Sequence, residues 1–235
     1  TVFENLREVR PSLFFAVPRV WEKVYSQVAI GLSEADKLQQ AAYGWAMQVG
    51  RAVAQCTLEG REPSGSLKLR YKLAQWLALN NVKRMIGMDR VEVGITGAAP
   101  ISPDLIRWFL ALGIPLREGW GMTETCGGGT ATPRSGIRSG SIGRPGPGLE
   151  MRIAAATNEI QLRGPNVILG YLNQPEKTAE TIDAEGWLHT GDVGTMDDRG
   201  YVRITDRLKD MYISGGFNVY PAEVEKLLAA HPAIS

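Results

Sequence analysis

The chain has 235 residues, of which 44% are hydrophobic and 22% charged, a composition typical of a globular protein with room for one domain and part of a second. Its 26 basic and 25 acidic residues give a net charge of +1, which argues against a nucleic-acid-binding surface. No stretch approaches the ~18 apolar residues of a membrane span. Two cysteines, Cys56 and Cys126, and no visible signal peptide indicate a cytoplasmic protein with free thiols.

The first elements are a strand and a helix. The short apolar run in residues 9–17 predicts a buried strand, and Pro18 is suited to the first turn of a helix that begins near Arg19. Apolar residues then recur at helical spacing, at Trp21, Val24, Tyr25 and Val28.

Two amphipathic helices are expected next. One runs from Ser33, as N-cap, to about Thr57, and the other from Ser66 to about Ile86, with a loop at residues 61–65 between them. The first stripe consists of Leu38, Ala42, Trp45, Val49 and Val53. The second consists of Leu69, Leu73, Trp76, Leu77 and either Asn80 or Val82. We expect both stripes to face a core; the alternative is that the helices bearing Trp45 and Trp76 rest on a bilayer.

The following segment has the rhythm of a parallel α/β sheet. Residues 91–96 alternate like a strand and lead into a small-residue turn at 97–100. Ser102 and Pro103 are the expected N-cap and first residue of a helix. A second short strand at 114–117 leads into another glycine turn, which favours strand, turn and helix units of an α/β fold.

After about residue 140 the pattern changes to short alternating strands. Residues 149–153, 159–163 and 201–205 predict an antiparallel β subdomain, and residues 221–230 predict a helix with Pro221 in its first turn. We therefore expect an α/β subdomain over 1–140 with inserted helices at about 33–86, a β-rich subdomain over 141–205, a hinge at 206–211, and the start of a further domain at 212–235.

The first candidate site is the segment Glu118-Gly-Trp-Gly-Met-Thr-Glu-Thr125. The hydroxyls of Thr123 and Thr125 can donate to phosphate oxygens, and Glu124 offers the oxygen ligand that Mg²⁺ prefers. Gly119 and Gly121 permit tight backbone turns, while Trp120 offers a flat face for a base. Taken alone, the same segment is also consistent with an ordinary glycine turn before a helix.

Two later segments add ribose-type and phosphate-type groups. Asp192, in Gly186-Trp-Leu-His-Thr-Gly-Asp192, can accept both hydroxyls of a ribose, and Arg207, in Asp206-Arg-Leu-Lys-Asp210, can pair with phosphate or ribose oxygens. Each segment alone is more typical of a common turn, and His189 is interpreted as a packing residue. A nucleotide site becomes the better interpretation only because all three segments occur together and in this order.

In their order and residue pattern the segments resemble the AMP-forming adenylating (acyl-activating) enzymes, in particular the long-chain fatty acyl-CoA synthetase branch that includes the bubblegum-type members. In this sequence Trp120 stands where a tyrosine is more usual. The resemblance covers essentially the whole chain, through residues 16–23 with the inserted helices, 97–100, 118–125, 159–178, 186–192 and 206–225. It implies the C-terminal half of the family's large domain, followed by the first elements of the small α+β domain.

The resemblance also implies roles for individual residues. Adenine stacks on Trp120, Thr123 holds phosphate, Glu124 holds Mg²⁺, Asp192 binds the ribose and Arg207 supports ribose and phosphate. The remaining nucleotide-site positions are Gly97, Ala98, Ala99, Gly119, Gly121 and Met122. Lys209 and Asp210 are implied as the hinge, and Ser214, Gly215 and Gly216 as a loop on the CoA side.

The implied reaction activates a long-chain fatty acid with ATP to an acyl-adenylate and then transfers the acyl group to CoA, with Mg²⁺ offsetting phosphate charge. The family's phosphate loop and catalytic lysine have no counterpart here, so we expect an internal piece of a longer ligase that does not turn over alone. The alternatives are an enzyme that loads a carrier protein, which the inserted helices disfavour, and a non-catalytic nucleotide-binding module. A membrane surface, contacted peripherally, is a further partner to consider.

Overall fold

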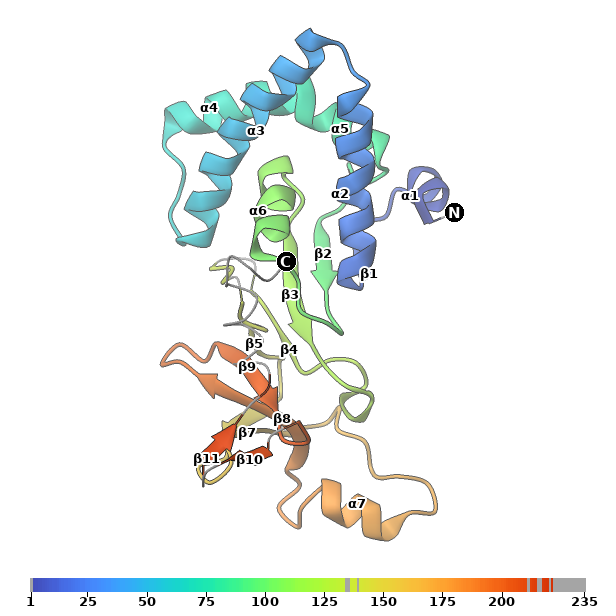
Figure 1. Ribbon diagram of the computed structural model, residues 1–235, viewed down its shortest axis with the longest axis vertical. Coiled ribbons are helices and arrows are strands. Elements are labelled where there is room, and N and C mark those ends of the chain that lie inside the picture. The colour runs from blue at the N-terminus through green and yellow to red at the C-terminus, as the bar shows by residue number, and fades with distance from the viewer. Residues whose placement is uncertain are drawn as a thin grey trace. The chain divides into compact units, whose positions relative to one another are not determined.

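The computed structural model describes residues 2–133, 136–138 and 140–210, the backbone of 212–214 and 217–219, and Pro221 (Figure 1). The chain divides into two compact units. Unit 1 comprises residues 1–119 and 132–140, and unit 2 comprises residues 120–131 and 141–235. The division falls inside one strand, after Gly119.

Unit 1 is built from helices around short parallel strands. Strand β2 pairs in parallel with β1 on one side and with β3 on the other, and Thr96 lies opposite Glu118 in the second pair. The elements are α1 (Val2–Val9), β1 (Leu13–Ala16), α2 (Pro18–Ser33), α3 (Lys37–Leu58), α4 (Gly65–Ala74), a π-helical turn (Gln75–Leu79), α5 (Asn80–Met85), β2 (Val93–Thr96), α6 (Pro103–Leu112) and β3 (Leu116–Trp120).

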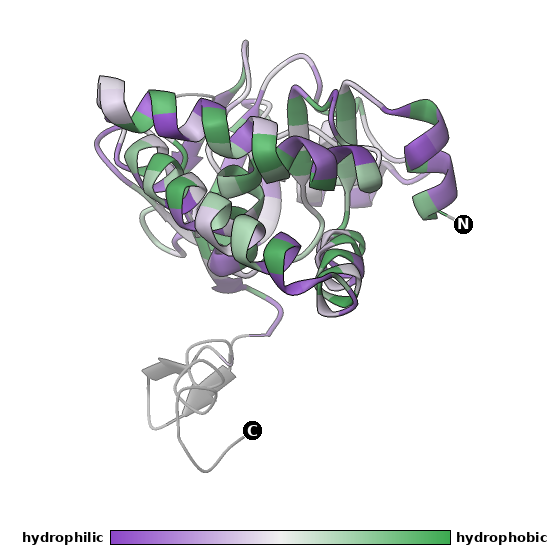
Figure 2. Ribbon diagram, turned by 90° about the horizontal axis from the view of Figure 1, so that it is seen from above, coloured by the Kyte–Doolittle hydropathy of each residue, from purple (hydrophilic) through white to green (hydrophobic). Residues whose placement is uncertain are grey.

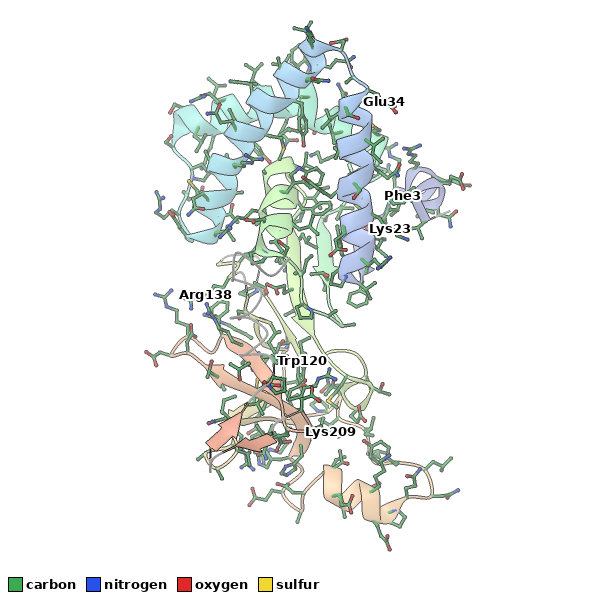
Figure 3. All side chains as sticks on the ribbon, in the orientation of Figure 1. Phe3, Lys23, Glu34, Trp120, Arg138 and Lys209 are labelled. Atoms are coloured by element: carbon green, nitrogen blue, oxygen red, sulfur yellow. The ribbon has the colours of Figure 1, made fainter. Side chains whose placement is uncertain are left out.

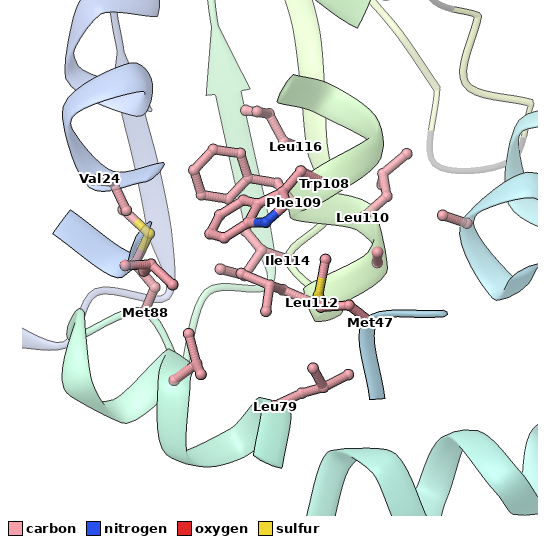
Figure 4. Packing of buried hydrophobic residues seen from close by; sticks show 14 of the residues in the cluster. Val24, Met47, Leu79, Met88, Trp108, Phe109, Leu110, Leu112, Ile114 and Leu116 are labelled. Carbon is pink, nitrogen blue, oxygen red and sulfur yellow. The ribbon is translucent and has the colours of Figure 1, made fainter. Parts of the chain in front are cut away.

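The core of unit 1 forms where α2 and α6 meet the strands. Trp21 of α2 and Phe109 of α6 are both fully buried, with ring centroids 4.9 Å apart in an edge-to-face arrangement. Trp21 also packs over Gly94 of β2, where a larger residue would crowd the ring. Figure 4 shows the apolar residues of α6 and β3 converging on this cluster. The sequence predicted α6 correctly, because Ser102 accepts a hydrogen bond from the Asp104 amide and Pro103 occupies the first turn.

Two expectations about the N-terminal segments are wrong. Residues 2–9 form helix α1, and the strand that follows is not buried, since Leu13 and Phe15 are 59% and 58% exposed. Ser33 is the last residue of α2 and donates to the Ile30 carbonyl instead of capping a new helix. The N-cap of α3 is Asp36, whose carboxylate accepts from the Gln39 amide at 2.8 Å.

The stripes expected to face the core do so only in part. On α3, Val49 is buried but Leu38 is 80% exposed. The predicted helix over 66–86 is interrupted by the π-helical turn. Its stripe points outward from Leu69 to Leu77, whereas Val82 is buried, and the opposite side of the segment packs against α3. No helix among the described residues is long and apolar enough to cross a membrane.

Unit 2 contains the antiparallel sheet that the sequence predicts, in the order β6-β7-β8-β9. Strand β8 and helix α7 were not expected from the sequence. The elements are a 3₁₀ turn (Thr123–Thr125), β4 (Thr130–Ala131), β5 (Arg144–Pro145), β6 (Glu150–Ile153), β7 (Glu159–Arg163), α7 (Pro175–Thr181), β8 (Leu188–Met196), β9 (Val202–Arg207), β10 (Tyr212–Ser214) and β11 (Phe217–Val219). Strands β10 and β11 form an antiparallel hairpin, and the predicted helix at 221–230 lies outside the described residues apart from Pro221.

Candidate functional site: a glycine turn and a ribose-type carboxylate

The candidate site begins with the turn that follows β3. Thr125 is fully buried; its hydroxyl donates to the Met122 carbonyl and accepts from the Met122 amide, both at 3.0 Å. Thr125 therefore closes the turn and is not available as the phosphate donor that the sequence suggested. Thr123 is exposed, as that role requires. Gly121 is needed here because a Cβ would overlap the Gly127 carbonyl.

Glu124 is half-buried in this turn, and a second segment of unit 2 holds it. The Tyr171 hydroxyl donates to Oε1 of Glu124 at 2.7 Å, and the Ile168 amide donates to the Glu124 main-chain carbonyl at 2.9 Å. The hydrogen bond to the carboxylate raises the pKa of Tyr171 above its ordinary value, with partial burial adding to the effect. Tyr171 was missed from sequence, since nothing in the chain pattern links it to a residue 47 positions earlier.

Trp120 and Asp192 come together within unit 2. The indole Nε1 of Trp120 donates to Oδ2 of Asp192 at 2.9 Å (Figure 3 labels Trp120). One edge of the indole ring lies against Gly129, where a Cβ would approach the ring carbons to 2.7 Å. The ring is half-buried, so part of it is open to solvent, as the stacking role predicted for it requires.

Arg207 approaches the same carboxylate from the neighbouring strand. Asp192 on β8 lies directly opposite Arg207 on β9, and Arg207 Nε lies 3.2 Å from Oδ1 of Asp192. The two oxygens of Asp192 thus have different partners, Trp120 and Arg207. Burial raises the pKa of Asp192, while its hydrogen bond from Trp120 and the positive charge of Arg207 act in the opposite direction.

A polar cluster on β7 and β8 supports the backbone beside Asp192. Glu159 is 5% exposed, and its Oε1 accepts from the Gly191 amide at 2.9 Å. Its Oε2 lies 3.0 Å from His189 Nδ1, so His189 belongs to a hydrogen-bonded cluster and not simply to a packing surface. Thr190 donates to the Ile160 carbonyl at 2.6 Å and accepts from the Asp192 amide at 3.1 Å. Asp192 therefore lies on an irregular strand, between Gly191 at φ 73° and a register shift at Val193 and Gly194, and not on a free turn as expected.

The small-residue segment lies in unit 1. Gly97 follows β2 and is buried, and a Cβ there would lie 2.8 Å from the Gly119 carbonyl, so the ends of β2 and β3 approach closely. Ala98, in the left-handed region at φ 68°, and Ala99 are both exposed. Burial raises the pKa of Glu118 to about 7, although the Gly140 amide donates to its Oε2 at 3.1 Å.

The expected hinge residues follow β9. Lys209 and Asp210 are exposed in a turn that is closed by the Asp210 amide donating to the Arg207 carbonyl at 3.1 Å. Ser214 ends β10, of which only the backbone is described, and Gly215 and Gly216 lie outside the described residues.

The residues around Glu124 fit a magnesium ion that is held mainly by a nucleotide. Among the described residues, no group of three or more His, Cys, Asp or Glu side chains is placed to bind a metal by itself. Mg²⁺ is commonly held by one or two carboxylates together with substrate phosphates. A single half-buried glutamate, oriented by a tyrosine hydroxyl, suits that second arrangement.

Solved structures of the adenylate-forming fold share this arrangement of elements. An ATP-bound MatB from Rhodopseudomonas palustris is 38% identical with a TM-score of 0.56, over 64% of this chain and 32% of that one. An O-succinylbenzoate coenzyme A synthetase from Bacillus subtilis, in complex with ATP and magnesium, is 35% identical with a TM-score of 0.52, over 60% and 32%. The fold of this chain is thus that of part of an adenylate-forming enzyme, with a mixed α/β sheet and an antiparallel sheet.

The sequence comparisons identify the family. Residues 1–172 match the family described as AMP-binding enzyme, and the chain belongs to it. Its relatives include a Mycobacterium tuberculosis protein provisionally named a fatty-acid–CoA ligase, 40% identical over 100% of this chain. They also include the long-chain-fatty-acid–CoA ligases ACSBG2 of Gallus gallus, 38% identical over 100% of this chain, and ACSBG1 of Rattus norvegicus, 38% identical over 96%. The chain spans 41%, 31% and 32% of these three relatives.

Proposed function

We propose that this chain carries nucleotide-binding residues of an AMP-forming ligase that activates long-chain fatty acids as acyl-adenylates and transfers them to CoA. The observation that carries the proposal is the carboxylate of Asp192, held at one oxygen by Trp120 and at the other by Arg207. A carboxylate has about four lone-pair sites, so after accepting two donors it can still accept both hydroxyls of a ribose. The long-chain assignment is supported by the names of the bubblegum-type relatives.

In this proposal each residue binds or orients, and none is required to form a covalent bond. Trp120 offers its ring to adenine, Asp192 accepts from the ribose hydroxyls, and Thr123 donates to a phosphate oxygen. Glu124, oriented by Tyr171, binds Mg²⁺, which offsets the charge that develops on the phosphates. Arg207, exposed along most of its side chain, reaches ribose or phosphate oxygens. Gly97, Ala98, Ala99, Gly119, Gly121 and Met122 keep the nucleotide-site positions implied by the resemblance.

The proposed reaction has two substitutions. The fatty carboxylate attacks the α-phosphorus of ATP and pyrophosphate leaves; the CoA thiolate then attacks the acyl carbon and AMP leaves. Lys209 and Asp210 are proposed as the hinge between these steps, and the loop at Ser214, Gly215 and Gly216 as the CoA side. The chain itself is proposed as the C-terminal half of a large domain with the beginning of a small one.

The test is AMP release from ATP, palmitate and CoA by the protein expressed from its complete reading frame. Glu124→Ala should abolish release. Tyr171→Phe should retain activity but raise the Mg²⁺ concentration needed for half-maximal rate several-fold, because the carboxylate loses its orienting donor. Tyr25→Phe, an exposed tyrosine of unit 1, is the matched control.

The outcomes separate the proposal from its rivals. Pyrophosphate exchange that requires the acid but ignores CoA would move the assignment to an enzyme that loads a carrier protein. AMP binding, lost in Asp192→Asn, without reaction of any acid would leave a nucleotide-binding module. Full activity in Glu124→Ala would contradict the metal assignment.

A further inference from the structure

Helix α4 and the π-helical turn after it present an apolar face to solvent. Four large apolar residues make up this face, which we call the 69–77 face: Leu69 is 70% exposed, Leu73 47%, Trp76 73% and Leu77 45%. Their spacing of four, three and one places them along one side of the helix. A run of this kind differs from the scattered single apolar residues of an ordinary surface.

The opposite side of the same segment is fixed to unit 1. Ala74, Ala78 and Leu79 are buried in the unit's core, and α4 packs against α3. The Tyr71 hydroxyl donates to the Ala111 carbonyl at 3.3 Å, and Gln75 Nε2 donates to the Leu112 carbonyl at 3.0 Å. These bonds tie the segment to the end of α6, so the 69–77 face cannot turn inward without breaking them. Figure 2 shows hydrophobic and hydrophilic residues alternating along the helices that face the viewer.

The exposed charged residues along the 69–77 face are cations. Residues 65–85 contain five cations, Lys68, Arg70, Lys72, Lys83 and Arg84, and no Asp or Glu, although the whole chain has a net charge of only +1. Arg70 and Lys72 are exposed, and at about 100° per residue they flank the line of Leu69 and Leu73 on its two sides. Lys68 pairs with Glu62 at 2.6 Å, and Lys83 is half-buried with its Nζ near Gly113 at the end of α6, so neither adds an available cation to the face.

We propose that the 69–77 face docks on an anionic lipid bilayer, with the apolar side chains at the level of the headgroups and acyl boundary and with Arg70 and Lys72 against lipid phosphates. An outward tryptophan and leucines between cations have the chemistry of an interfacial helix. A second copy of this chain fits less well, because a self-contact through this face would bring its cations together. The inference does not rest on the ligase chemistry, and its test uses no ATP, acid or CoA.

The experiment is co-sedimentation of the purified protein with vesicles of phosphatidylcholine alone and of phosphatidylcholine with about 30% phosphatidylglycerol. Wild type should bind the anionic vesicles. Leu69→Ser with Trp76→Ser should lower the partition coefficient at least about tenfold, and Arg70→Gln with Lys72→Gln should lower it about tenfold on anionic vesicles only, at a few-fold per charge. Lys37→Gln with Leu38→Ser is the matched control, since it removes one exposed cation and a leucine that is 80% exposed outside the face.

Circular dichroism and thermal melts establish that each variant is folded, and sedimentation velocity without vesicles reports self-association. Absence of wild-type binding to anionic vesicles would overturn the proposal. So would binding that survives the Leu69 and Trp76 changes, or that falls equally in the control. Loss of a dimer in the Leu69 and Trp76 variant, without vesicle binding by wild type, would assign the face to a second copy.

Discussion

Asp192 shows how two donors can orient a single carboxylate. The indole N–H of Trp120 and the guanidinium of Arg207 bind different oxygens, so the protein itself defines the plane of the carboxylate. Burial works against the charge and raises the pKa of Asp192. The ring N–H is the only hydrogen-bond donor in the Trp120 side chain. Trp120→Phe would therefore remove the bond to Asp192 and keep an aromatic face.

Glu118 gives a pH-dependent prediction. Burial raises the pKa of its carboxyl to about 7, against 4.5 for an unperturbed group. The folded protein therefore holds this proton when the unfolded chain has lost it. Its contribution to stability is fully present below pH 4.5 and is lost as the pH rises through 7. At 1.36 kcal/mol per pKa unit the whole loss is about 3 kcal/mol.

Glu118→Gln should remove this dependence, because the amide stays neutral and can still accept from the Gly140 amide. Urea unfolding at pH 5 and pH 8 should show a variant that gains about 2–3 kcal/mol over wild type on going to pH 8. Glu92→Gln, at an exposed glutamate of the same unit, is the control. Parallel pH profiles for wild type and Glu118→Gln would refute the prediction.

Helices α3 and α6 approach each other so closely that one glycine decides their spacing. A Cβ at Gly50 of α3 would overlap the backbone carbonyl of Ala111 in α6, and backbone cannot move aside as a flexible side chain can. We expect Gly50→Ala to lower the free energy of unfolding by about 1–3 kcal/mol, the usual cost of overpacking. Urea denaturation measures it.

Gly44 is the matched control within the same helix. A Cβ there has nothing within 4 Å, so Gly44→Ala should raise the free energy of unfolding by about 0.5–1 kcal/mol through the lower backbone entropy of alanine in the unfolded chain. The two substitutions are chemically identical and should differ in sign. A change of the same sign at both positions would rule out the close helix contact.

The elements that sequence predicts well are those whose signal is local. Pro18 and Pro103 mark helix starts because a proline fits the first turn whatever lies around it. Ser33 was wrongly predicted as an N-cap because Asp36, three residues later, can accept the same hydrogen bond. Only the path of the chain decides which of the two residues caps α3. The stripe from Leu69 to Leu77 misled for another reason: periodicity shows that a helix has an apolar side, but not which side the rest of the unit covers.

The candidate site divides in the same way. Trp120, Glu124 and Asp192 stand out in the sequence because these residue types, with their neighbours, suit a nucleotide. Their roles stay predictions until nucleotide binding is measured. Tyr171 and Glu159 could not be found from spacing, since they act through tertiary hydrogen bonds to Glu124 and Gly191. Thr125 was assigned a phosphate role that its burial prevents, because a sequence does not say which of two threonines closes its own turn.

For the whole molecule, the distribution of charge matters more than its sum. A net charge of +1 gives no long-range attraction to an anionic surface, whereas Arg70 and Lys72, exposed beside the 69–77 face with no acid between residues 65 and 85, give a local one. Binding of the 69–77 face to vesicles should therefore combine a short-range electrostatic part with an apolar part that is insensitive to screening.

Salt separates these two parts. The Debye length falls from about 10 Å at 0.1 M to about 3 Å at 1 M, so charges at the headgroup level are largely screened at the higher concentration. Binding of wild type to anionic vesicles should weaken about tenfold or more across this range, since two exposed cations each contribute about 1 kcal/mol near such a surface. The Arg70→Gln and Lys72→Gln variant should start lower and change much less, because the groups that sense the salt are gone. Equal salt sensitivity in wild type and variant would place the attraction elsewhere on the chain, and the 69–77 face would then act through its apolar residues alone.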